Sequence, residues 1–248
     1  MIPVVVWGAG GRMGKRLINL VSQEKDMELV GAVENEGHQG IFQDAGFYHG
    51  LPETGVLLSM TCEPKPEPAK GIVLDFSLSG GLAKAAEWAQ KYGWVLVSGT
   101  TSLNDRDRLA LSLASEKIPA MYSPNYSLGT QLLFHLVSKA AAILPETFDA
   151  TIHETHHRAK RDRPSGTALA FEQRLKNSGV VRHFETTSHR AGLIFGEHSI
   201  RFVSPMEEIV LSHRALDRDV FAAGAIMAGK WLLKKPPGLY AFTDMLEL

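Results

Sequence analysis

The stretch VVVWGAGGRMG, Val4–Gly14, joins a β-branched apolar run to a turn that is rich in glycine. The next segment, Lys15–Gln23, places its apolar residues on one side, as a helix would. Glycines between a strand and a helix permit a tight turn and let a pyrophosphate approach the N–H groups at the helix N-terminus. The stretch therefore predicts the first strand and helix of a nucleotide-binding α/β domain.

The glycine spacing departs from the usual G-x-G-x-x-G, because Met13 takes the third glycine position and Gly14 follows it. A simple tight turn is an equally good interpretation of the glycines alone. Glu34 favours a cofactor site, because it ends the second predicted strand, where an acid accepts hydrogen bonds from ribose hydroxyls; the alternative is a solvated strand end. Gly99-Thr100-Thr101, at a later strand end, could line the nicotinamide side or form a plain turn.

The rest of the first half repeats this alternation. The predicted strands are nearly all apolar, which indicates a parallel sheet covered by helices on both faces. The predicted strands are Val4–Trp7, Glu28–Val33, Gly71–Ser77 and Trp94–Ser102, and the helices are Lys15–Gln23, Leu82–Tyr92 and Asp105–Glu116, the last capped by Asn104.

The second half has a different pattern, which predicts a sheet with antiparallel alternation packed against helices. Its strands are DATIHE (149–154), LIFGEHSIRFV (193–203) and EEIVLSHRA (207–215), and its helices are 128–144, 168–176 and 218–233. In the first of these helices, Leu132, Leu133, Leu136 and Val137 form a stripe that is expected in the core.

Composition restricts the class of protein. The chain has 248 residues, 44% hydrophobic and 21% charged, which is typical of soluble globular proteins. A formal charge of −1 argues against a general nucleic-acid binder. The single cysteine, Cys62, excludes a disulfide framework and fits a reducing compartment. The N-terminus resembles neither a signal peptide nor a membrane span, so a cytoplasmic protein is expected. The proline-rich segment 62–71 is predicted to be a surface loop.

The stretch HETHHRAKRDRPSGTA, 153–168, allows several interpretations. His153-Glu154-x-x-His157 matches the H-E-x-x-H pattern of zinc hydrolases, although β-branched residues before it disfavour the helix this site needs. A nucleic-acid-binding patch is disfavoured, because the stretch lacks interleaved aromatic residues. A solvated basic loop without a function remains a possible interpretation. Ser165 or Thr167 can cap the helix that follows, so its N–H groups, a lysine and an imidazole would together form a carboxylate receptor.

A longer motif decides among these interpretations. The pattern E-x-H-H-x-x-K-x-D-x-P-S-G-T-A, from Glu154 to Ala168, is long and specific, and the chain resembles the 4-hydroxy-tetrahydrodipicolinate reductase (dihydrodipicolinate reductase) family in it. Supporting matches run along the whole chain: GAGGRMG, LDFS, VSGTTS, SPNYSLG, FGEH, SHRALDR, FAAGA and GLY.

The resemblance implies a Rossmann-type, doubly wound parallel sheet domain, residues 1–127 and 218–248. It also implies an α+β substrate-binding and tetramerisation domain with a mixed sheet, residues 128–217, and a homotetramer. The implied reaction is the NAD(P)H-dependent reduction of 4-hydroxy-tetrahydrodipicolinate, via dihydrodipicolinate, to tetrahydrodipicolinate in the diaminopimelate route of lysine biosynthesis. No metal is expected.

The resemblance also assigns roles to residues. His156 would protonate the substrate ring as hydride arrives from nicotinamide C4, and Lys160 would hold the substrate and stabilise developing charge. The implied substrate-binding residues are His157, Ser165, Gly166 and Thr167. The implied cofactor-binding residues are Gly11, Arg12, Met13, Glu34, Gly99, Thr101, Asn125 and Tyr126. The glycine turn and the later strand end add Gly8 and Thr100 to this set.

Four features depart from the family pattern. Asn35 stands where many relatives have a basic residue that pairs with the 2′-phosphate of NADP, so NADH is expected to be favoured over NADPH, although Arg12 could contact a phosphate. Arg163 replaces an alanine and Ser102 a glycine, and the stretch 177–190 is shorter than in many relatives.

A zinc hydrolase and an NAD-binding homologue without catalysis are the alternative functions.

Overall fold

The computed structural model describes residues 1–63, 70–179 and 183–247, and the chain divides into two compact units. The first unit comprises Met1–Tyr126 and Phe221–Leu248, and the second comprises Ser127–Val220. Part of the predicted loop 62–71 and part of the stretch 177–190 lie outside the described residues. None of the helices in the described ranges is long and apolar enough to cross a membrane.

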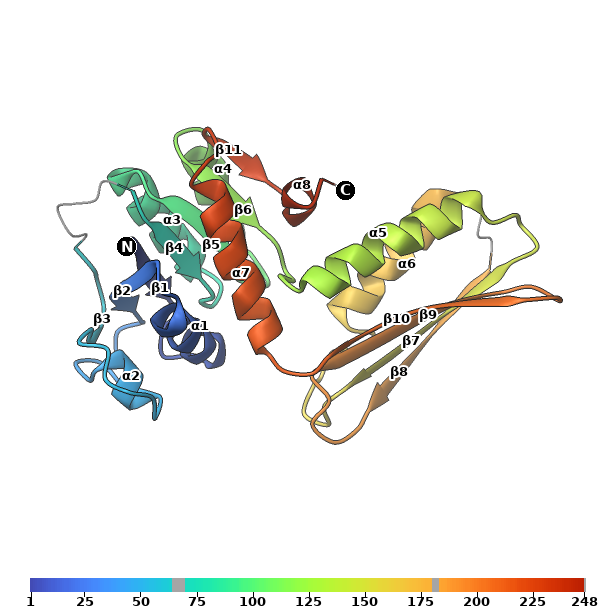
Figure 1. Ribbon diagram of the computed structural model, residues 1–248, viewed down its shortest axis with the longest axis horizontal. Helices are drawn as coiled ribbons and strands as arrows, with labels where there is room; N and C mark the ends of the chain where they lie inside the picture. The colour runs from blue at the N-terminus through green and yellow to red at the C-terminus, as the bar shows by residue number, and fades with distance from the viewer. Residues whose placement is uncertain (64–69, 180–182, 248) are drawn as a thin grey trace. The chain divides into compact units, whose positions relative to one another are not determined.

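The first unit contains a seven-stranded parallel sheet in the order β11-β6-β5-β4-β1-β2-β3 (Figure 1). Its strands are β1 Ile2–Trp7, β2 Met27–Val33, β3 Leu58–Ser59, β4 Ile72–Asp75, β5 Val95–Ser98, β6 Pro119–Tyr122 and β11 Gly238–Tyr240. Its helices are α1 Arg12–Gln23, α2 Ala45–Tyr48, α3 Gly81–Tyr92, α4 Asp105–Ser115, α7 Asp219–Leu232 and α8 Phe242–Met245.

Both faces of this sheet are covered, because its strands are apolar on both sides. Val4 and Val6 of β1 pack in one core with α1 and α7, whereas Val5 and Trp7 pack in a second core with α3 and α4. Successive side chains of a strand point to opposite faces, so one apolar run supplies both cores. The doubly wound parallel sheet predicted from the sequence is therefore confirmed.

The glycine turn between β1 and α1 needs its glycines at two places. Gly8 has a φ of +76°, and a Cβ there would lie 2.7 Å from the carbonyl oxygen of Phe76. A Cβ on Gly14 would lie 2.3 Å from the carbonyl oxygen of Ala9, so α1 could not pack against the turn. Helix α1 begins at Arg12, three residues before the predicted start, because the prediction placed the whole glycine stretch up to Gly14 in the turn.

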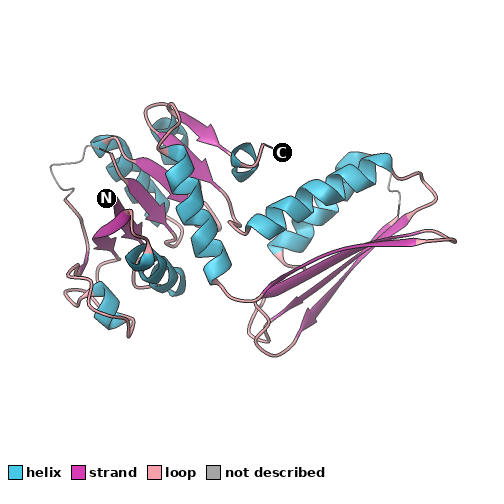
Figure 2. Ribbon diagram, in the orientation of Figure 1, coloured by secondary structure: helices cyan, strands magenta, loops and turns pink. Residues whose placement is uncertain are grey.

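The second unit contains a four-stranded mixed sheet, drawn in magenta in Figure 2. Its strand order is β10-β9-β7-β8, as labelled in Figure 1. Strand β9 is antiparallel to β7 and β10, whereas β8 is parallel to β7, as the resemblance implied for a mixed sheet. Helices α5 and α6 cover one face of the sheet. The elements are α5 Leu128–Ile143, β7 Asp149–His156, α6 Gly166–Ser178, β8 Phe184–Arg190, β9 Gly196–Val203 and β10 Glu208–Ala215.

The structure differs from the sequence analysis at two places in this unit. Strand β8 was not predicted, because its sequence FETTSHR is polar and forms an edge strand with no apolar alternation. The predicted core stripe of α5 is only half buried: Leu133 and Val137 are buried, but Leu132 is 45% exposed and Leu136 is 42% exposed. Residues four positions apart lie on the same face of a helix. Leu133 and Val137 form the face that packs in the core, whereas Leu132 and Leu136, each one position earlier, lie beside that face and stay exposed.

Candidate active site

Strand β7 carries the first half of the motif. Its side chains alternate, so Glu154 and His156 are buried on the helix side, while His153 lies on the other face and pairs its Nδ1 with the Thr187 hydroxyl at 2.7 Å. The zinc interpretation required His153 and His157 on one face of a helix, and it is wrong because the segment is a strand.

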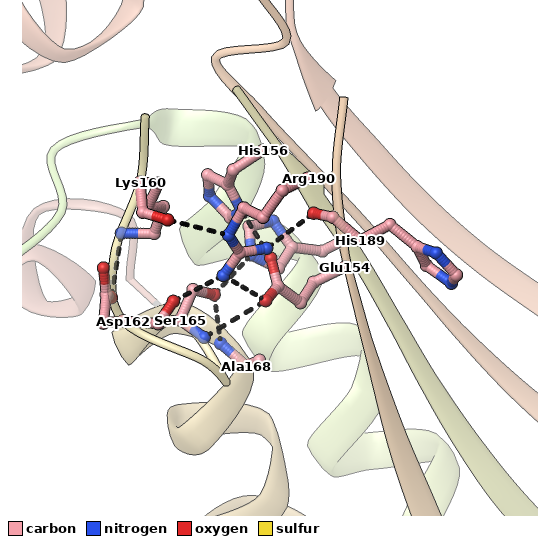
Figure 3. A network of polar contacts seen from close by, with 9 residues as sticks. Glu154, His156, Lys160, Asp162, Ser165, Ala168, His189 and Arg190 are labelled. Carbon is pink, nitrogen blue, oxygen red and sulfur yellow. Dashed lines mark hydrogen bonds and ion pairs between the residues drawn. The ribbon is translucent and has the colours of Figure 1, made fainter. Parts of the chain in front are cut away.

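Glu154 has no exposed surface and lies at the centre of a polar network (Figure 3). Its Oε1 contacts the Arg190 guanidinium at 2.8 Å and accepts from the Ser165 backbone N–H at 3.3 Å, while Oε2 pairs with Nδ1 of His156. Burial raises the pKa of this carboxyl, but hydrogen bonds from Arg190, Ser188 and His156 outweigh burial and hold the pKa below its usual value. Glu154 is therefore an anion at neutral pH.

His156 is 7% exposed, and its pKa is lowered. Burial is the largest cause, Glu154 opposes it, and the positive charges of Lys160 and Arg190 add to it. In the free protein the His156 ring is accordingly neutral at neutral pH.

Arg190, the last residue of β8, ties this strand to the loop after β7. It donates to the carbonyl oxygens of Lys160 and Asp162, besides contacting Glu154. Its side chain is only 2% exposed. Sequence reasoning missed this residue, because it is far along the chain from the motif; its place just before the FGEH match was the available signal.

The loop and the start of α6 place positive charge beside the backbone N–H groups of a helix N-terminus. The Lys160 ammonium lies 2.9 Å from the Asp162 carboxylate and remains 24% exposed. Ser165 caps α6, since its Oγ accepts from the Ala168 N–H at 3.2 Å. Gly166 is exposed in the first turn, and a helix N-terminus beside a lysine attracts carboxylates.

Three further motif residues surround this start of α6. His157 and Thr167 are half-buried, and Arg163 is exposed. These positions are consistent with the substrate-binding roles predicted for His157 and Thr167, and they assign no role to Arg163.

His198 of β9 is a second histidine that sequence reasoning did not single out. It is 4% exposed, its ring centroid lies 5.1 Å from that of His156, and its Nε2 lies 3.2 Å from the Ser165 hydroxyl. Burial, helped by the nearby His156, lowers the pKa of His198 to about 3, so this ring stays neutral. The donor atoms of Glu154, His156 and His198 lie within 4.8 Å of one another, but a cation there would compete with Arg190 for the carboxylate.

The first unit has a cavity of about 450 Å³ at the glycine turn. Its lining includes the predicted residues Gly8, Gly11, Arg12, Met13, Glu34, Gly99 and Thr101, and Gly10 of the predicted glycine turn. It also includes four residues that sequence reasoning did not name: His38, Phe76, Ser77 and Leu78. Both oxygens of Glu34 are engaged, one by the Gly10 N–H at 2.9 Å and the other by the Asn35 N–H at 2.8 Å.

The other predicted cofactor residues, Thr100, Asn125 and Tyr126, do not line this cavity. Thr100 is buried and donates to the Asp75 carboxylate at 2.9 Å, and Tyr126 is buried and donates to the Ser98 carbonyl at 2.9 Å. Asn125 lies beside Tyr126 and is outside the cavity lining. Ser102, where the family has glycine, has a φ of +59°, so the loop keeps a conformation that glycine favours.

The glycine turn and the acid after β2 fit the adenosine half of a nicotinamide dinucleotide. The turn would accept the pyrophosphate, and Glu34 would accept hydrogen bonds from ribose hydroxyls. Together, the doubly wound sheet, this cavity and the buried histidine network define a dinucleotide-dependent oxidoreductase.

Comparison with known proteins identifies the family. The models for the N-terminus and C-terminus of dihydrodipicolinate reductase match residues 2–126 and 129–246. The chain belongs to the dihydrodipicolinate reductase family. It is 40% identical over 245 residues to a 4-hydroxy-tetrahydrodipicolinate reductase from Xanthomonas campestris pv. campestris (strain B100), covering 99% of this chain and 98% of the relative. It is 36% identical over 267 residues to the enzyme of that name from Anaeromyxobacter sp. (strain Fw109-5), covering 100% and 98%.

A solved structure shares the fold. The dipicolinate-bound dihydrodipicolinate reductase from Paenisporosarcina sp. TG-14 aligns with a TM-score of 0.72 at 19% identity, covering 97% of each chain.

Proposed function

We propose that this protein reduces 4-hydroxy-tetrahydrodipicolinate, by way of dihydrodipicolinate, to tetrahydrodipicolinate in the diaminopimelate route of lysine biosynthesis. The observation that carries the proposal is the carboxylate receptor at Lys160 and the start of α6, next to the buried His156. Family membership over nearly the whole chain supports the same reaction.

In this proposal the substrate dicarboxylate is held by Lys160, the Ser165 cap and the first N–H groups of α6. The bound nicotinamide supplies the hydride. His156 supplies the proton to the ring, and burial works against this role by lowering the pKa of His156 in the free protein. Two substrate carboxylates near the imidazole ring would raise that pKa, so substrate binding would favour the protonated form of His156.

The cofactor preference in this proposal is NADH. The Glu34 carboxylate, fixed by Gly10 and Asn35, would repel a 2′-phosphate, and Asn35 supplies no positive charge to offset it. Arg12 also lines the cavity, so some use of NADPH is compatible with the proposal.

The oligomer in this proposal is a homotetramer. Among the described residues, α5 and α6 cover one face of the four-stranded sheet. The strand register places mostly polar side chains on the opposite face. We call this the open sheet face, and its residues are Thr151, His153, Thr155, Glu185, Thr187, His189, Glu197, Ser199, Arg201, Val210, Ser212 and Arg214. This face supports self-association through the sheet.

The test is NADH oxidation at 340 nm, with the cyclic imine generated by the preceding enzyme of the pathway. The wild-type protein is expected to oxidise NADH only when the imine is supplied. Lys160→Ala should lower kcat/KM for the imine by roughly 100-fold, because it removes a charge-assisted contact worth about 3 kcal/mol.

Arg161→Ala is the matched control, since it removes an exposed positive charge from the next position and should change kcat/KM less than threefold. Absence of imine-dependent turnover with both NADH and NADPH would refute the proposed function.

A further inference from the structure

Glu154 is the buried anion of the site, and the proposed reaction as described gives it no role. Its carboxylate meets the Arg190 guanidinium, the Ser165 N–H and the His156 ring (Figure 3). A hydrogen bond from Ser188 adds a fourth donor. A carboxylate buried this completely is costly unless it is paired, and Arg190 provides the pairing.

The contact with Glu154 determines where the His156 ring carries its hydrogen. An ionised carboxylate only accepts hydrogen bonds, so the Nδ1 atom that faces Glu154 must be the protonated one. The neutral ring then has its lone pair on Nε2. A Cβ at position 196 would lie 3.0 Å from that atom, so glycine at this position leaves space beside Nε2 that a larger residue would fill.

The charges around His156 come from every neighbouring element. Glu154 faces it from its own strand, Arg190 from β8, His198 from β9 and Lys160 from the loop after β7. Lys160 and Arg190 oppose an imidazolium, and His198 is neutral. Among these groups, Glu154 supplies the negative charge.

We propose that Glu154 is a positioning residue for the general acid, which holds His156 in the Nδ1–H tautomer and stabilises the imidazolium that protonates the substrate from Nε2. Arg190 fixes the carboxylate in turn. In the step, the Nε2–H bond breaks and its electron pair stays on the imidazole. The proton forms a C–H bond on the ring that accepts the hydride, and solvent later restores the proton. The inference rests on the proposed reduction.

The first test is the pH dependence of kcat for Glu154→Gln, which keeps the side-chain size and removes the charge. The wild-type rate should fall as pH rises through the pKa of the acid. In Glu154→Gln this fall should move to lower pH by about one unit, with a loss of kcat of roughly 10- to 100-fold at pH 8 and a smaller loss at pH 6. Glu154→Asp should restore the position of the fall.

A purely structural role for Glu154 would lower kcat by the same factor at every pH, and that outcome would overturn the inference. The KM for the imine should change much less than kcat, because Glu154 acts through His156. NADH binding by calorimetry shows whether the first unit is intact, and hydrogen exchange of the β9 amides shows whether the second unit keeps its fold.

The second test uses the wild-type protein and does not depend on activity or on a variant. Nitrogen-15 NMR of labelled histidines, with the His156 signals identified by their loss in His156→Asn, should show Nδ1 protonated and Nε2 bare at pH 8. An Nε2–H tautomer would overturn the inference. A wild-type protein with the expected tautomer but no imine turnover would instead refute the proposed function, so the two failures are distinguishable.

Discussion

At the scale of single residues, cofactor choice depends on two neighbouring positions at the end of β2. Glu34 accepts hydrogen bonds from backbone N–H groups on both oxygens, which holds the side chain in place. Asn35 is exposed beside it and cannot neutralise a phosphate. A change at Asn35 alone should therefore alter the preference.

Asn35→Arg is expected to lower the KM for NADPH by roughly tenfold and to leave the KM for NADH within about twofold. A guanidinium–phosphate hydrogen bond is worth about 1.5–3 kcal/mol, and tenfold corresponds to 1.4 kcal/mol. Steady-state kinetics with both cofactors measure the change. Asn35→Gln, which adds length without charge, is the control. A wild-type protein that already prefers NADPH would contradict the interpretation of Asn35.

At the scale of elements, strand alternation explains how the site is assembled. Because β7 and β9 pair in antiparallel register, Glu154 stands opposite His198, and both side chains point toward α6. The cap of α6, Ser165, contacts both of them. The sequence predicted the alternation of β7, but it did not predict the polar edge strand β8, which carries Arg190.

The buried His198 should make the second unit sensitive to acid. Its folded-state pKa is about 3, whereas an unfolded histidine titrates near 6.5, so only the unfolded state takes up this proton as pH falls below 6.5. Stability from this group is complete above pH 6.5 and is lost as pH falls, by about 1.4 kcal/mol per pH unit. Between pH 7 and pH 5, the loss is roughly 2 kcal/mol.

His198→Gln should remove this part of the pH dependence, whatever its effect on absolute stability. All four tryptophans lie in the first unit, so hydrogen exchange of the β9 amides is the suitable measurement. If the variant loses as much protection between pH 7 and pH 5 as the wild type does, the assignment of His198 as a neutral buried ring is wrong.

At the scale of the whole molecule, the open sheet face is the feature that relates to assembly. One row of mostly small polar side chains crosses the sheet and consists of Thr187, His153, Ser199 and Ser212. Charged residues lie in the rows on either side of it, Glu185 and Arg201 in one and Glu197 and Arg214 in the other. Small polar side chains allow two sheets to approach closely and still form hydrogen bonds. These properties suit a face that pairs with a copy of itself.

Light scattering after size exclusion should give a mass four times that of the chain. Ser199→Arg, at the middle of the open sheet face, is expected to shift the protein to smaller species, because four guanidinium groups would be buried without partners. Leu113→Arg, on the exposed side of α4, adds the same charge and should leave the mass unchanged. A wild-type monomer, or a tetramer that survives Ser199→Arg, would contradict the proposed assembly.

Local patterns in the chain were enough for the doubly wound sheet, the glycine turn and the Asn104 cap of α4, because each depends on neighbouring residues. The motif from Glu154 to Ala168 likewise pointed to His156 and Lys160. The partners of Glu154 could not be found this way. Arg190 and His198 reach it only through the order and register of β8, β7 and β9, which depend on contacts between distant segments. Tertiary structure therefore decided which charges surround the buried histidine.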